Sequence, residues 1–166
     1  MSEFSPCPVR NIERLDRAVF NPIHIDKQGR LKPSLFTHAF AKGCSIQRGC
    51  LATTEELVAF FTKMLRDQVG WTWYGVVTAS GEGIRAITVD DSKSRGMCLY
   101  DTALRENPAH AEIAMSSTPS LQFDEPELRK HLTDAFGGGK IVRPKEYRGG
   151  AVLDAMPADL RSRIAV

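Results

Sequence analysis

The clearest periodic pattern of hydrophobic and polar positions spans residues 54–68. Hydrophobic side chains recur there every three or four positions, and charged side chains fill the remaining arc. This spacing predicts an amphipathic helix with one face buried in a core. Thr53 and Glu56 stand three positions apart at its start, as in a capping box, where each side chain accepts a hydrogen bond from the backbone N–H of the other residue.

Residues 124–136 predict a second amphipathic helix. Pro126 lies in its first turn, where a backbone N–H has no helical partner to lose. Three consecutive glycines at 137–139 then end the helix. The hydrophobic positions of this helix are four residues apart: Leu128, Leu132 and Phe136.

Extended segments surround the two helices. Residues 71–79 are rich in aromatic and β-branched side chains, which favours a strand. A Ser-Gly-Glu-Gly turn separates them from residues 84–89, so we expect a β-hairpin. Residues 9–20 fit a short helix, or a strand from residue 16, and periodicity does not decide between them. Further strands are predicted at 45–48, 97–100 and 109–115.

These elements predict an α+β fold. We expect a small, mostly antiparallel sheet with the two main helices packed on one face. The length of 166 residues suits one domain, which we place at residues 9–136. Residues 1–8 are expected to be a disordered lead-in, and residues 137–166 a C-terminal extension packing on or beside the domain.

Composition narrows the function classes. Hydrophobic residues make up 42% and charged residues 25% of the chain, which excludes wholesale disorder. The formal net charge is only +2, so charge alone gives no reason to expect a nucleic-acid or membrane partner. We find no apolar run of membrane-spanning length, no secretory signal pattern and no Cys-x-x-Cys pair, and therefore expect a cytoplasmic protein with reduced cysteines and no cofactor.

His110 and Glu112 are the first candidates for chemistry. They stand in a His-Ala-Glu sequence, as in zinc-dependent nucleobase deaminases, but no Pro-Cys-x-x-Cys follows to complete a zinc site. On a strand the two side chains share one face. A solvated polar face of the sheet explains the same pattern.

Arg48 extends this set to a hypothetical active site. If Arg48, His110 and Glu112 met on one face, the arginine would bind an anionic or nucleotide-like substrate and the other two would transfer protons, as in a small hydrolase or transferase. A non-catalytic interpretation is that Arg48 and His110 form part of a binding surface. Its residues would be Arg48, Trp71, Trp73 and His110.

Two further sets are weaker candidates. His24, His38, Cys44 and Cys50 have side chains that suit zinc, but their spacing is wider than in compact structural sites, and buried inert cysteines explain them as well. Basic side chains are concentrated near the C-terminus, which would suit nucleic acid, although solvated charges explain them equally. These are Lys140, Arg143, Lys145, Arg148, Arg161 and Arg163.

The block Asn107-Pro108-Ala109-His110-Ala111-Glu112-Ile113 contains the pattern N-x-A-H-x-x-[IV]. With the segments before and after it, this block resembles small bacterial proteins encoded among defence or mobile-element genes, for which no activity is known. The resemblance covers most of residues 16–136 and implies a bacterial cytoplasmic protein. Because the sequence shows no complete catalytic or cofactor motif beside the possible binding surface, we expect a non-catalytic interaction module of a multi-protein bacterial system with a protein partner. The small hydrolase or transferase is the alternative.

Overall fold

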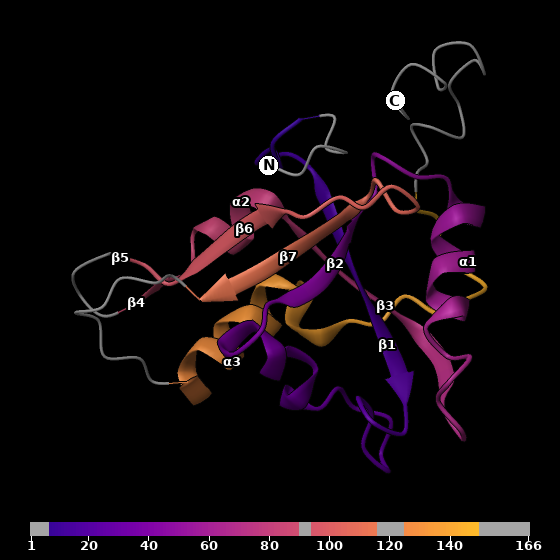
Figure 1. Ribbon diagram of the computed structural model, residues 1–166. Helices are drawn as coiled ribbons and strands as arrows, with labels where there is room; N and C mark the ends of the chain where they lie inside the picture. The colour runs from indigo at the N-terminus through magenta and orange to yellow at the C-terminus, as the bar shows by residue number, and fades with distance from the viewer. Residues whose placement is uncertain (1–6, 90–93, 116–124, 150–166) are drawn as a thin grey trace.

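The computed structural model describes residues 7–89, 94–115 and 125–149. Five antiparallel strands form its main sheet, in the order β3-β1-β2-β7-β6 (Figure 1). The α+β class and the antiparallel sheet are confirmed. The strands are β1 (Arg14–Asn21), β2 (Cys44–Arg48), β3 (Thr72–Ser80), β6 (Met97–Asp101) and β7 (His110–Met115).

Strand β1 determines how the sheet is covered, because it carries hydrophobic side chains on both faces. Leu15 and Val19 belong to one buried cluster, whereas Ala18 and Phe20 belong to another. Since successive strand residues point to opposite faces, the two clusters lie on opposite sides of the sheet. A sheet covered on one face would have polar residues at alternate positions along the whole strand, whereas Ala18 and Phe20 are buried and hydrophobic on the side opposite to Leu15 and Val19.

The two main helices accordingly lie on opposite faces, not on one face as expected. Helix α3 (Glu125–Ala135) packs with the short 3-10 helix η1 (Pro33–Phe40) against the Leu15 and Val19 face. Helix α1 (Thr54–Lys63) packs against the Ala18 and Phe20 face (Figure 1).

The capping box at the start of α1 is present as predicted. Thr53 Oγ1 accepts a hydrogen bond from the Glu56 backbone N–H at 3.2 Å, and Glu56 Oε2 accepts one from the Thr53 N–H at 2.7 Å. The helix ends at Lys63, five residues before the predicted end.

The predicted hairpin at 71–79 and 84–89 is wrong. The first segment is strand β3, but its partner is β1. Ser80 Oγ accepts a hydrogen bond from the Gly83 N–H, which starts the short helix α2 (Gly81–Arg85) in place of a turn. Ile84 of this helix is fully buried in the core. The chain continues into β4 (Thr88–Val89), which pairs with β5 (Ser94–Arg95) in a separate two-stranded sheet.

Part of the C-terminal extension belongs to the domain. After the short turn η2 (Gly137–Gly139), Val142 pairs with Val76 of β3. Tyr147 is buried beside α1, and its hydroxyl donates a hydrogen bond of 2.8 Å to Asp16 Oδ2. Residues 150–166, with Arg161 and Arg163, lie outside the described residues, as do residues 1–6. None of the helices in the described ranges combines the length and apolar character needed to cross a membrane.

Candidate functional site

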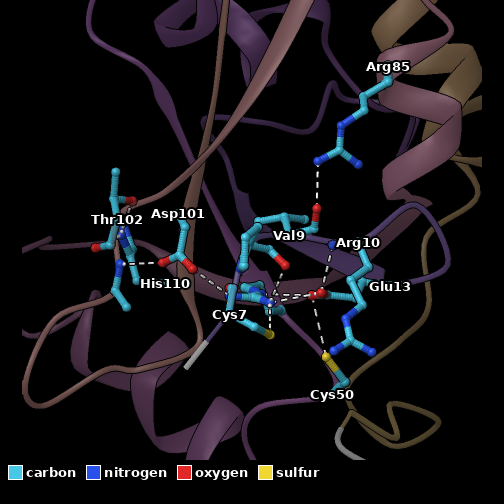
Figure 2. A network of polar contacts seen from close by, with 12 residues as sticks. Cys7, Val9, Arg10, Glu13, Cys50, Arg85, Asp101, Thr102 and His110 are labelled. Carbon is cyan, nitrogen blue, oxygen red and sulfur yellow. Dashed lines mark hydrogen bonds and ion pairs between the residues drawn. The ribbon is translucent and has the colours of Figure 1, made fainter. Parts of the chain in front are cut away.

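Arg48 is the largest fully buried side chain of the described core. Its Nε and Nη2 donate hydrogen bonds to the two carboxylate oxygens of Glu13 at 2.7 and 2.8 Å, and its Nη1 donates to Asp101 Oδ2 at 2.8 Å. The backbone carbonyls of Cys7 and Pro8 accept further hydrogen bonds from the guanidinium. Figure 2 shows these partners converging from distant parts of the chain.

This network ties three segments together. The guanidinium on β2 joins the start of the described chain to the carboxylates before β1 and at the end of β6. Burial alone would lower the pKa of Arg48, but hydrogen bonds and charge from Glu13, with Cys7 and Asp101, raise it above its ordinary value. Arg48 is therefore a structural anchor, and Cys7 and Pro8 of the expected lead-in are held by it.

Arg48 does not meet His110 and Glu112. In the antiparallel register, Arg48 lies opposite Leu15 and Gln47 lies opposite His110. Because neighbouring residues of β2 point to opposite faces, Gln47 shares the face of His110 and Arg48 does not. The hypothetical active site of the three residues is therefore not assembled.

His110 and Glu112 do share one face of β7, as predicted, and both are partly buried. His110 Nδ1 lies 2.8 Å from Thr102 Oγ1 and 3.1 Å from the Thr102 carbonyl oxygen. Thr102 follows the strand β6 and holds the imidazole from the neighbouring loop (Figure 2).

Trp71 and Trp73, which were predicted to share one binding surface, have different surroundings. Trp73 packs against the rings of Phe61 and Tyr147, and its Nε1 donates a hydrogen bond to the Gly75 carbonyl at 2.8 Å. Trp71 lies just before β3, with its ring 6.1 Å from that of Phe20. Trp73 therefore contributes to the core, whereas Trp71 lines a cavity.

We name this the Arg17 cavity; its volume is about 380 Å³. It exists because β1 and β2 pair only at two positions, ending with Asp16 opposite Gln47, and then separate. Arg17 Nη1 crosses the gap and donates a hydrogen bond of 2.7 Å to the Ser45 carbonyl. Six further side chains that line the cavity are Phe20, Ile23, His24, His38, Met64 and Trp71.

Arg17 is buried, with 8% of its surface exposed. Its Nη2 donates to the Leu35 carbonyl at 3.3 Å, but its buried Nε has no hydrogen-bond partner. Among the described residues, no carboxylate forms an ion pair with it. Within the described part of the chain its hydrogen-bond acceptors are thus two carbonyl oxygens, and neither carries a full negative charge.

His24 supplies a neutral hydrogen-bond donor beside Arg17. Its Nδ1 accepts a hydrogen bond of 3.1 Å from the Phe20 backbone N–H, so the neutral ring carries its proton on Nε2. Burial, followed by the charges of Arg17, His38 and Lys32, lowers the pKa of His24 to about 4. At neutral pH the cavity therefore contains one buried positive charge and one neutral imidazole N–H.

The candidate metal ligands are not brought together. His24 and His38 both line the Arg17 cavity. Cys44 is buried, and burial raises the pKa of its thiol. Cys50 donates a hydrogen bond to Glu13 in the Arg48 network, and burial and the Glu13 charge raise its pKa to about 12. Within residues 7–89, 94–115 and 125–149, no three His, Cys, Asp or Glu side chains come close enough to hold a metal ion.

Two of the basic residues proposed for nucleic acid, Arg143 and Arg148, have separate partners. The Arg143 guanidinium lies 3.7 Å from the centroid of the Tyr74 ring and, with Arg30, lines an open hollow of about 540 Å³. Arg148 donates hydrogen bonds to the carbonyls of Lys145 and Tyr147. The nucleic-acid partner stays a prediction.

Sequence reasoning missed Arg17, the central residue of the cavity. The sequence contains one signal for it. If the segment is a strand, Leu15, Arg17 and Val19 are alternate residues on one face, so a charged residue lies between two hydrophobic residues that face a core. Because periodicity does not decide between a helix and a strand for this segment, the sequence does not show that the arginine points toward the core.

No family model, curated protein or solved structure matches this chain. The resemblance carried by residues 107–113 therefore remains an expectation. The chemistry of the Arg17 cavity is the most specific ground for a function.

Proposed function

We propose that this chain is a non-catalytic binding module of a multi-protein bacterial system in the cytoplasm, and that it recognises an anionic group in the Arg17 cavity. One observation carries the proposal. A guanidinium with 8% of its surface exposed lines a cavity and has no carboxylate partner among the described residues.

Electrostatics explains why this observation points to an anion. A buried charge is stable when an opposite charge or a full set of hydrogen bonds compensates for its lost hydration. Arg48 meets that condition with two carboxylates. Arg17 meets it only in part, through two carbonyl oxygens. An anion in the cavity would supply the missing charge.

The size and lining of the cavity support binding of a small group. Its volume of about 380 Å³ lies in the range of ligand pockets, about 300–1,000 Å³. Such pockets combine apolar walls with a few polar groups that orient the ligand. Here Phe20 and Trp71 are the apolar walls, and Arg17 and His24 are the polar groups.

Catalysis receives less support from the same groups. His24 Nδ1 is engaged by a backbone N–H, and its low pKa makes the ring a weak base. The hydroxyls of the lining residues Ser34, Thr37 and Ser45 form no hydrogen bond to an imidazole within the described part of the chain. A nucleophile paired with a base, which acyl or glycosyl transfer needs, is therefore not formed there.

Fluorescence of Trp71 provides the test. In a Trp73→Phe background, Trp71 is the remaining tryptophan, and an anion bound beside it changes its emission. We expect inorganic phosphate or phenylacetate to change this emission in a saturable manner. Arg17→Gln should abolish the response at millimolar probe, whereas Arg105→Gln, which removes an exposed arginine outside the cavity lining, should leave it unchanged. A response that survives Arg17→Gln, or no response to either anion, contradicts the proposal.

A further inference from the structure

We infer that the anion is a carboxylate attached to an apolar, planar body, an inference that rests on the proposed function of the Arg17 cavity. Charge balance favours a single negative charge. Arg17 is the only buried cation found among the lining residues. His24 beside it is uncharged at neutral pH and adds one N–H donor. A dianion such as phosphate would leave one charge buried without a partner.

A carboxylate also suits the hydrogen bonds that remain. Arg17 has five N–H groups, and two of them are donated to the carbonyls of Ser45 and Leu35. Carboxylates accept from guanidinium groups through two oxygens, and hydrogen bonds between charged groups are stronger than those between neutral groups. The Nε2–H of His24 provides a third donor for the same anion.

The walls of the cavity indicate which chemical group the rest of the ligand carries. The ring of Phe20 lies 6.1 Å from that of Trp71 and 5.9 Å from that of His24, so the three rings form one continuous wall. Offset or tilted packing of another aromatic ring against such a wall is favourable.

The rim of the cavity is apolar as well. Ile23 is 39% exposed and Met64 is 38% exposed, and both line the cavity. A ligand that covers these two side chains would remove apolar surface from water, which is favourable. The site therefore has a charged interior and an apolar rim, which matches an amphipathic monoanion.

Two sources present this chemistry: a free aromatic carboxylate, or the C-terminal residue of a partner protein when that residue is aromatic. Trp71 emission in the Trp73→Phe background distinguishes them. The probes are phenylacetate, acetate, inorganic phosphate, and a short peptide ending in phenylalanine with either a free or an amidated C-terminus.

We expect phenylacetate to bind about 10- to 100-fold more tightly than acetate or phosphate, because its ring is buried against Phe20 and Trp71. If the source is a partner protein, the free-acid peptide binds more tightly than phenylacetate, and the amidated peptide does not bind. If the source is a small molecule, phenylacetate binds more tightly than either peptide.

A second variant keeps the test valid if Arg17→Gln fails to fold. Ile23→Glu places a negative charge at the rim, on a side chain that is already partly exposed. It should weaken phenylacetate binding about tenfold by charge repulsion. Ile12→Glu is the matched control, because Ile12 is 87% exposed and does not line the cavity, and it should leave binding unchanged.

The outcomes separate the inference from the function on which it rests. Phosphate or acetate binding as tightly as phenylacetate, with loss in Arg17→Gln, overturns the apolar carboxylate and leaves an anion-binding module. No binding of any probe, or binding that Arg17→Gln and Ile23→Glu do not weaken, overturns both.

Discussion

Arg17 and Arg48 are two buried arginines on neighbouring strands and on the same face of the sheet, yet their surroundings differ completely. Arg48 donates hydrogen bonds to two carboxylates and two backbone carbonyls. Arg17 donates to two carbonyls and faces a cavity with its Nε unpaired. Burial alone therefore does not identify a functional arginine. The decisive feature is whether a carboxylate of the fold balances the charge of the guanidinium.

The largest expected effect is on stability, at Arg48. Replacing it by methionine removes the positive charge and leaves the carboxylates of Glu13 and Asp101 buried without their partner. We expect Arg48→Met to lower the free energy of unfolding by about 3–5 kcal/mol, measured by urea denaturation. A loss below about 1 kcal/mol would mean that the network does not anchor the fold.

The Arg48 network also predicts a pH dependence. Burial alone would raise the pKa of Glu13, but hydrogen bonds from Arg48 and the Arg10 backbone N–H, and the Arg48 charge, lower it below its ordinary 4.5. A carboxyl with a lowered folded pKa stabilises the fold above its unfolded pKa, and this contribution is lost as the pH falls. The wild type should therefore lose stability below pH 4.5, and Arg48→Met should lose less there.

In the Arg17 cavity, His24 predicts a second pH dependence of stability. Its pKa falls from 6.5 to about 4 on folding, so the unfolded state binds more protons between these values. Stability should therefore decrease as the pH falls through this window, by about 2 kcal/mol between pH 7 and pH 5. His24→Asn, which keeps an acceptor for the Phe20 N–H, should remove this part of the pH dependence. Equal slopes of unfolding free energy against pH in the two proteins would contradict a buried neutral His24.

The smallest expected effect on stability is at Arg17. Arg17→Met removes two hydrogen bonds to carbonyls, but it also removes a buried charge that no carboxylate of the described residues pairs with. These terms oppose each other, so we expect a change of about 1 kcal/mol or less in urea denaturation. A loss as large as that of Arg48→Met would show that Arg17 is a structural anchor too.

Several elements of the fold could be predicted from local patterns. The capping box at Thr53 and the apolar stripe of 125–135 act over three or four residues, so their signals are complete in the sequence. The faces of the sheet on which the helices lie could not be predicted from a local pattern. It depends on β1 carrying Leu15 and Ala18 on opposite faces, which becomes visible only once its extended conformation is known.

The candidate site was less predictable for the same reason. His110 and Glu112 could be placed on one face, because two positions on a strand suffice for that. The hypothetical active site required Arg48 and His110 to meet, but the register between β2 and β7 puts Gln47 opposite His110. The Arg17 cavity depends on the separation of β1 and β2, and no short pattern encodes this distance between strands.

The central claim is that the charge of Arg17 is balanced by an anionic ligand. Its most direct test compares phenylacetate with 2-phenylethanol, an uncharged molecule of similar size, by titration of Trp71 emission in Trp73→Phe protein with and without Arg17→Gln. We predict that the acid binds about 10- to 100-fold more tightly than the alcohol, and that Arg17→Gln removes this difference. Equal affinity for the acid and the alcohol when Arg17 is intact would contradict the claim.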